Sequence, residues 1–210
     1  MDQGLVRQQV LAVVAKIIAK DGADAVQIRD VCRKTKKTAP TIYRLFGNRE
    51  QLIAETQAYR FSYKQRELID QFSNRTYLAK SRAEFIKIAH ASFEIMLSEQ
   101  RQNYRKMRVE VLGAAMSDKT LATRIDESIK ESARLGAPAI KYAQAHGWIS
   151  DNFDAETFIA YIPGISNARA NVELTTKNSL RNEWDKIAVR SLCLLIGIPE
   201  PKNAKRKKIT

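Results

Sequence analysis

The sequence has few of the residues from which metal sites and disulfide frameworks are built. It holds two cysteines and two histidines in 210 residues, and the cysteines, Cys32 and Cys193, lie far apart within apolar helical patterns. A secreted disulfide scaffold carries more cysteines at regular spacings, so we interpret both as reduced, buried thiols of a cytoplasmic protein. No cluster of Cys, His and Asp has metal-ligand spacing, so we expect no metal and no cofactor.

Catalytic and membrane patterns are missing as well. The sequence has no Ser/His/Asp spacing, no phosphate-binding loop and no dinucleotide glycine pattern, and its acidic residues are scattered singly, which argues against an enzyme. It also lacks a run of about 18 apolar residues and the basic-then-apolar layout of a signal peptide. We therefore expect a soluble protein that stays in the cytoplasm and does not enter a membrane.

Positive charge is abundant, and it is distributed unevenly. The net charge is +13, and residues 1–50 hold ten Lys/Arg against five Asp/Glu. Residues 201–210 hold five basic residues and no acidic one, whereas the chain between these ends is nearly balanced. Two basic ends favour a polyanionic partner, and nucleic acid is preferred over a membrane surface or general solubility.

The apolar pattern is helical, because β-branched residues do not gather into alternating runs bounded by turns. A first helix over about 6–20 would bury the stripe Val6, Val10, Val14, Ile17 and Ile18. Gly22 suits the left-handed stop after it. Two short helices follow over about 27–35 and 39–46, and Asn48 is a suitable N-cap for a long fourth helix. We predict an all-α fold.

Further helices are expected over about 81–99, 102–116, 119–146, 154–175 and 181–197. Pro138 and Pro163 fall inside two of them, where each proline removes a backbone donor and crowds the preceding turn. We expect kinks or breaks there.

The segment 27–46, QIRDVCRKTKKTAPTIYRLF, has the layout of a helix-turn-helix. Its first helix would bury Ile28, Val31 and Cys32, and its second would bury Ile42 and Phe46. Thr38 is a good N-cap, since its hydroxyl can accept a bond from an amide one turn into the helix. The second helix of such a motif enters the DNA major groove with its N-terminal residues leading.

The exposed side chains of that second helix are those that DNA binding would use. Thr38 and Thr41 offer hydroxyls to phosphates or base edges, and Pro40 offers an apolar face to a thymine methyl. Tyr43 and Arg44 can reach phosphates, and Arg44 could alternatively reach a guanine.

Four basic residues lie beside this helix in the sequence. Arg29 can make a bidentate contact with guanine, and Lys36, Lys37 and Arg49 are placed as phosphate clamps. Exposed Lys and Arg often only face water, so the pattern by itself leaves this alternative open. With Gln27, the predicted DNA-binding set is Gln27, Arg29, Lys36, Lys37, Thr38, Pro40, Thr41, Tyr43, Arg44 and Arg49.

This segment resembles the DNA-binding domain of the TetR family of bacterial repressors. The resemblance is carried by IRDV at 28–31, PTIYRLF at 40–46 and NREQLI at 48–53, and it covers about residues 5–60. Two departures matter. Lys36-Lys37 stands where the family usually has a glycine and an apolar residue, so a left-handed turn would be strained. Gln27 replaces the usual Ser/Thr cap.

The resemblance implies a homodimer bound to a palindromic double-stranded operator and a small-molecule effector held by the larger domain. Aromatic and methionine side chains are the candidates for an apolar or aromatic pocket: Phe93, Met96, Tyr104, Met107, Met116, Tyr142, Phe158 and Tyr161. The last two long helices would form the dimer interface, with Phe158, Ile162, Ile165, Val172, Leu192, Leu195 and Ile196. Ordinary core packing is the alternative for each of these residues.

We accordingly divide the chain into a helix-turn-helix domain over 1–47, a helical regulatory and dimerisation domain over 48–198, and a disordered basic tail over 199–210. The alternative function is a basic DNA-coating or partner-binding protein of the same fold that has no effector, to which a basic tail would add salt-sensitive affinity.

Overall fold

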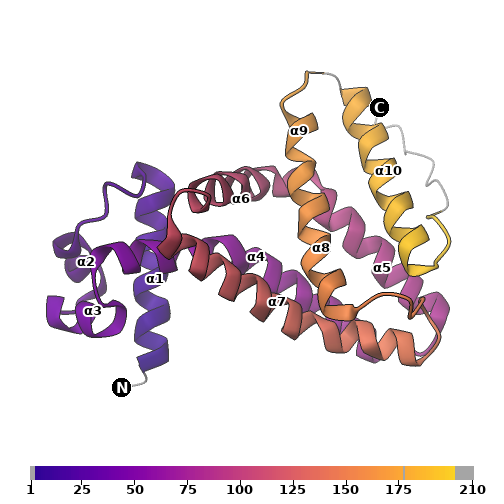
Figure 1. Ribbon diagram of the computed structural model, residues 1–210, viewed down its shortest axis with the longest axis horizontal. Coiled ribbons are helices and arrows are strands. Elements are labelled where there is room, and N and C mark those ends of the chain that lie inside the picture. Colours follow the sequence, from indigo (N-terminus) through magenta and orange to yellow (C-terminus); the bar gives the residue numbers. More distant parts are fainter. Residues whose placement is uncertain (1–2, 177, 202–210) are drawn as a thin grey trace, which may run out of the picture. The chain divides into compact units, whose positions relative to one another are not determined.

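The computed structural model describes residues 3–176 and 178–201, and within them it contains helices and turns but no strand (Figure 1). The helices are α1 (Gln3–Asp21), α2 (Ile28–Thr35), α3 (Ala39–Phe46), α4 (Arg49–Leu78), α5 (Arg82–Leu97), η1 (Glu99–Arg101), α6 (Gln102–Ala115), α7 (Lys119–Ala145), α8 (Ala155–Ala168), α9 (Ala170–Glu173) and α10 (Asn178–Ile196). The all-α prediction is confirmed. Most of the predicted basic tail, 202–210, lies outside the described residues.

The helices divide by their contacts into two compact units. The first runs to Lys64 and includes Arg108–Ile129, and the second comprises Gln65–Met107 and the chain from Lys130 on. An N-terminal helix-turn-helix is thus followed by a larger helical part. The boundary predicted at residue 47 stays a prediction. No helix of the described chain has the length and apolarity needed to cross a membrane.

The core of the first unit follows the predicted stripe. Val6, Val10, Val14, Ile17 and Ile18 are all buried on α1. Of these, Val10, Val14, Ile17 and Ile18 belong to a core cluster with Val26 of the loop after α1 and with residues of the next helices: Val31, Ile42, Phe46 and Leu52.

The predicted ends of α1 and α4 in this unit are also confirmed. Gly22 stops α1 with a φ of 84°, a left-handed conformation that costs glycine little. Asn48 caps α4 by accepting a bond from the Gln51 amide at 2.8 Å.

The second unit has its own core, to which α5, α7, α8 and α10 contribute (Figure 1). Phe85, Phe93, Phe158 and Leu192 are among its buried residues. At Gly136 on α7, a Cβ would lie 2.9 Å from the side chain of Ile159 on α8, so a larger residue at this position would force that side chain to move.

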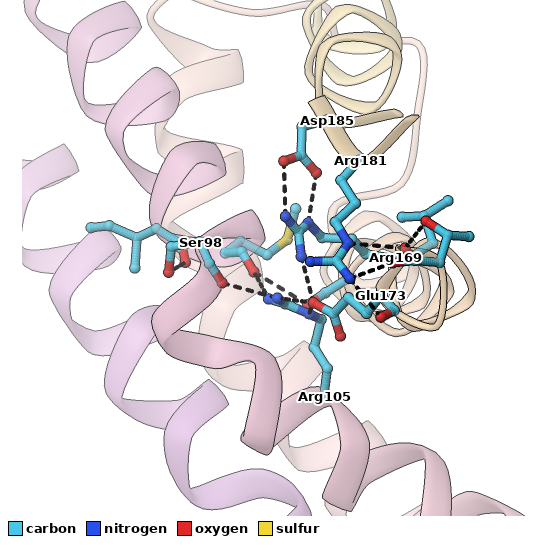
Figure 2. A network of polar contacts seen from close by, with 11 residues as sticks. Ser98, Arg105, Arg169, Glu173, Arg181 and Asp185 are labelled. Carbon is cyan, nitrogen blue, oxygen red and sulfur yellow. Dashed lines mark hydrogen bonds and ion pairs between the residues drawn. The ribbon is translucent and has the colours of Figure 1, made fainter. Parts of the chain in front are cut away.

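A buried network of charged side chains also joins helices of the second unit (Figure 2). Arg105, from the start of α6, is fully buried and forms an ion pair with Glu173 of α9, whose side chain is 6% exposed. Arg169 pairs with the same carboxylate and also donates to both oxygens of Asp185 on α10, at 2.6 and 3.0 Å. Two arginines and two carboxylates therefore compensate one another, and of the four only Asp185, at 29% exposed, is partly open to solvent.

Backbone carbonyls satisfy the remaining donors of this network. Arg105 donates to the carbonyls of Met96 and Ser98 at the end of α5, at 3.1 and 2.9 Å. Arg181 of α10 donates to carbonyls at and just after α9, including those of Val172 and Glu173. The four-residue α9 is thus held by side chains from α6 and α10, because so short a helix gains little from its own hydrogen bonds.

We expected a kink or a break at each proline, but neither proline interrupts its helix. Pro138 lies within an unbroken α7, and Pro163 lies within α8, which continues to Ala168. The predicted helix over 154–175 is instead divided at Arg169, where the amides of Val172 and Glu173 both bond to the Arg169 carbonyl. The division thus falls at a residue of the buried network.

Candidate nucleic-acid interface

The turn between α2 and α3 is made by a lysine in an unusual backbone conformation. Lys36 has φ 55° and ψ 36°, and it is the one non-glycine residue with positive φ in the described chain. Its amide and that of Lys37 both bond to the Cys32 carbonyl, which closes the end of α2. The left-handed turn that the sequence predicts is therefore present, with a side chain that disfavours it.

Replacing this lysine by glycine should stabilise the protein. We expect Lys36→Gly to raise the free energy of unfolding by about 0.5–1 kcal/mol, because relief of the left-handed strain exceeds the extra entropy of glycine in the unfolded chain. Urea unfolding followed by circular dichroism measures this change. Lys37→Gly is the matched control and should destabilise, since Lys37 has no positive φ to relieve; equal effects of the two variants would contradict the explanation.

The helix α3 is fixed by its inner face and leaves its outer face accessible. Ile42 and Phe46 are 1% and 4% exposed in the core of the first unit, as predicted. Pro40, Tyr43 and Arg44 are exposed on the other side. The helix therefore presents polar and charged side chains outward while its apolar side chains anchor it.

Thr38 occupies the N-cap position of α3, as predicted, but its hydroxyl does not cap the helix. It lies 3.0 Å from the Thr41 hydroxyl instead. The second helical position is Pro40, which has no N–H, so one of the two amides that a cap usually binds is missing. The two hydroxyls face each other at the leading end of α3.

Five residues of the predicted set surround one hollow of about 400 Å³ in the first unit. They are Lys36, Lys37, Thr38, Thr41 and Arg44, and the lining is completed by Gln3, Val6 and Leu45. Three cationic side chains and two hydroxyls around a concave surface suit an anionic backbone such as that of DNA.

The residues predicted at the start of α2 are also accessible. Gln27 is the N-cap residue, makes no side-chain capping bond and is exposed. Arg29, two residues further on, is exposed as well, whereas Arg33 on the same helix pairs with Asp30 at 3.0 Å.

Arg49 has partners that the sequence did not indicate. Its Nε donates to the Val26 carbonyl at 2.7 Å, and its Nη2 donates to the carbonyls of Asp24 and Ala23 at 3.0 and 3.4 Å. Arg49 thus fastens the start of α4 to the loop between α1 and α2. Arg49 therefore has a structural role in the first unit. Its contact with a DNA phosphate stays a prediction.

The predicted effector-pocket residues are only partly gathered. Phe93, Met96 and Phe158 are buried in the core of the second unit, and Tyr142 packs against it. Tyr104 and Met107 are half-buried, with Arg101 over the Tyr104 ring. Tyr161 is exposed. Met116 is 90% exposed and belongs to the first unit, whereas the other candidates belong to the second.

The predicted interface residues are mostly inside the chain. Phe158, Leu192 and Ile196 belong to the core of the second unit. Val172 is buried as well. Ile162 and Ile165 are half-buried, and Leu195 is partly exposed.

The exposed apolar residues of α10 form a different stripe: Leu180, Ile187 and Leu194. Their spacing of seven residues, which is typical of helix–helix interfaces, is present in the sequence, but the interface predicted from sequence consists of other residues.

A second hollow, of about 490 Å³, lies within the second unit. It is lined by residues from the end of α5, from η1 and from α10, with acidic residues such as Glu94 and Glu200 and basic residues such as Arg169 and Lys186. The sequence did not indicate this hollow, because its lining has no periodic pattern. Among the described residues, no group of three His, Cys, Asp or Glu could hold a metal ion.

Comparison with known proteins agrees with this geometry. Residues 10–56 match the family model described as bacterial regulatory proteins of the tetR family. No curated protein sequence matches the chain.

Three solved structures show the same fold over most of both chains. A regulator from Rhodococcus sp. assigned to the TetR family superposes with a TM-score of 0.65 at 16% identity, covering 93% of this chain and 100% of that one. A regulator from Saccharomonospora viridis in complex with choline gives 0.54 at 13% identity, covering 91% and 96%. FadR from Bacillus subtilis in complex with stearoyl-CoA gives 0.51 at 15% identity, covering 87% and 97%.

Proposed function

Because the chain belongs to the tetR family of bacterial regulatory proteins, whose DNA-binding helix-turn-helix it carries, we propose that it is a cytoplasmic transcriptional repressor. It binds a palindromic operator as a homodimer and leaves that operator when a small effector binds. The observation that carries the proposal is the two-sided α3, whose Ile42 and Phe46 are buried while Pro40, Tyr43 and Arg44 are exposed. A helix held in this way can present its leading end to base edges in the major groove.

The exposed stripe on α10 supports the homodimer. Ile187 and Leu194 are 66% and 68% exposed, and a monomer would leave both of these large apolar side chains in water. Small residues, Gly164 and Ala168, are exposed on α8, where they would let a partner helix approach closely. Apolar residues repeated every seven positions on one helix suit packing against the same helix of a second copy about a two-fold axis. The dimer would then carry two helix-turn-helix motifs, one for each half of a palindrome.

The stripe can be tested directly. We expect Ile187→Glu to convert the dimer to a monomer, because a carboxylate would then be buried without a partner in the interface. Light scattering coupled to size-exclusion chromatography measures the mass. Leu78→Glu on α4 is the matched control, since Leu78 is 77% exposed but lies off the stripe, and it should leave the mass unchanged. A monomeric parent protein, or a dimeric Ile187→Glu variant, would contradict the proposed interface.

The proposed effector is apolar or aromatic, because side chains of that kind are gathered in the second unit. Phe93, Met96 and Phe158 pack there with Tyr142 at the edge. Sulfur and aromatic rings adapt to varied apolar ligands. Release follows if the effector binds one arrangement of the helices better than another, since only that difference in affinity shifts the equilibrium.

Selection of bound fragments from random DNA tests the proposed function as a whole. We expect an inverted repeat with half-sites about one helical turn apart, as a two-fold dimer requires. Enrichment without a consensus would favour the alternative, a basic DNA-coating protein. The five basic residues in 201–210 are consistent with that alternative. In that case, deletion of residues 202–210 would remove most of the affinity, rather than only reducing its salt dependence.

A further inference from the structure

The orientation of α3 must come from contacts with other helices. An isolated helix of eight residues is unstable in water, and the last four carbonyls of any helix lack partners within it. In α3 these carbonyls belong to residues 43–46. The Gly47 amide bonds to the Tyr43 carbonyl at 2.7 Å and the Asn48 amide bonds to the Phe46 carbonyl at 3.1 Å. Neither of these amides bonds to the Leu45 carbonyl.

The Leu45 carbonyl accepts a bond from Arg7, a residue of α1 that is 38 positions away in the chain. The Arg7 Nη1 donates to this oxygen at 2.6 Å. The guanidinium also lies over the ring of Phe46, with Cζ 4.7 Å from the ring centroid. A cation at the C-terminal end of a helix is favourable because the helix dipole is negative there.

The same guanidinium is held in place by α4. Its Nε donates to Glu55 Oε1 at 2.6 Å, and its Nη2 donates to Glu55 Oε2, so the carboxylate is bound by two parallel bonds. The side chains of Arg7 and Glu55 are 38% and 16% exposed. Such a fork fixes a planar guanidinium in orientation as well as in position, which a lysine could not do.

We propose that Arg7 and Glu55 are positioning residues for DNA recognition. Together they form a clamp that fixes the C-terminal end of α3 against α1 and α4 without touching a base. The proposal rests on the proposed function, in which α3 reads DNA. Tyr43 and Arg44 lie within two residues of the clamped carbonyl, so a loosened end of α3 would displace both.

A different role for Arg7 would be direct contact with a phosphate. The two roles predict opposite changes in DNA affinity when the charge of Glu55 is removed. If Arg7 bound phosphate, removing the Glu55 charge would free the guanidinium and reduce repulsion of DNA, so binding would tighten. If the clamp positions α3, removing that charge should loosen the helix and weaken binding to the operator.

The experiment compares Glu55→Gln and Arg7→Gln with the parent protein on the selected operator and on a scrambled duplex. We expect each variant to lose about tenfold in operator affinity and to keep its affinity for scrambled DNA, because the charge-assisted bonds of the clamp are lost and the phosphate contacts remain. The slope of log K against log salt should stay unchanged in Arg7→Gln, whereas loss of one phosphate contact would reduce it by about 0.9.

Glu50→Gln is the matched control. Glu50 is an exposed acid in the first turn of α4 that lies outside the clamp, so this variant removes the same charge and should bind operator as well as the parent or better. Tighter operator binding by Glu55→Gln, or equal losses on both duplexes in Arg7→Gln with a reduced salt slope, would overturn the proposal.

Hydrogen exchange of the free full-length protein gives a readout that needs no operator. We expect the Gly47 and α3 amides to exchange about tenfold faster in both clamp variants, while the amides of α1 stay protected. If the parent protein selects no DNA consensus, the proposed function fails and this measurement still decides the clamp. Unchanged exchange of α3 in both variants would show that the clamp does not fix this helix.

Discussion

Glu173→Gln should lower the free energy of unfolding by about 3–5 kcal/mol. Glu173 is the shared carboxylate of Arg105 and Arg169, whose side chains are 0% and 4% exposed. A neutral amide of the same shape would leave two buried cations with one remaining carboxylate, Asp185. The loss arises from this uncompensated charge, and not from the net contribution of the intact network, which can be small.

Two further variants, compared by urea unfolding, separate the effect of an uncompensated buried charge from the net contribution of the intact network. Glu183→Gln removes an exposed partner of Lys186 on α10 and should change stability by less than about 1 kcal/mol. Replacing both Arg105 and Glu173 by Met should cost less than Glu173→Gln alone, because no buried charge from that pair is then left unpaired. A Glu173→Gln variant as stable as Glu183→Gln would show that the buried network does not hold α9.

Arg29→Ala should weaken operator binding by about 1–3 kcal/mol and relax the preference at one base position, because a bidentate contact with guanine is lost. Tyr43→Ala should weaken operator binding as well, by removing a contact from the exposed face of α3. Fluorescence anisotropy with the selected operator and with single-base variants of it measures both effects.

Arg33→Ala is the matched control for Arg29. It removes an equal charge from the same helix, but Arg33 pairs with Asp30 and lies outside the predicted set. We expect Arg33→Ala to lose a little DNA affinity, by the same factor for every duplex. If Arg33→Ala relaxed the base preference and Arg29→Ala did not, the assignment of the reading residues would be wrong.

The local elements of the first unit could be predicted from sequence because their causes are local. The spacing of Val6, Val10 and Val14 places them on one face of a helix, and Gly22 and Asn48 have the chemistry that ends and begins helices. The strain at Lys36 followed from the need for a left-handed residue in the turn. The exposed set on α3 followed from the same periodicity that buries Ile42 and Phe46.

The second unit was predicted less well, because apolar spacing does not say what a helix packs against. The residues Phe158, Leu192 and Ile196 have the spacing of an interface but fill the core of their own chain. Ile187 and Leu194 also repeat at seven residues, but spacing alone does not say which apolar residues of α10 stay outside the core. Similarly, Pro163 marks an expected break, but the break falls at Arg169, a residue of the buried network.

The sequence by itself determined that this chain is helical, that it carries a helix-turn-helix, and which side chains of that motif face away from the core. These properties depend on residues three or four positions apart, which a helix brings onto one face. The tertiary structure decided which apolar stripe stays exposed and which partners Arg7, Arg49 and Arg105 take. Those pairings join residues up to 68 positions apart, and a pair of opposite charges at such a distance leaves no trace in local spacing.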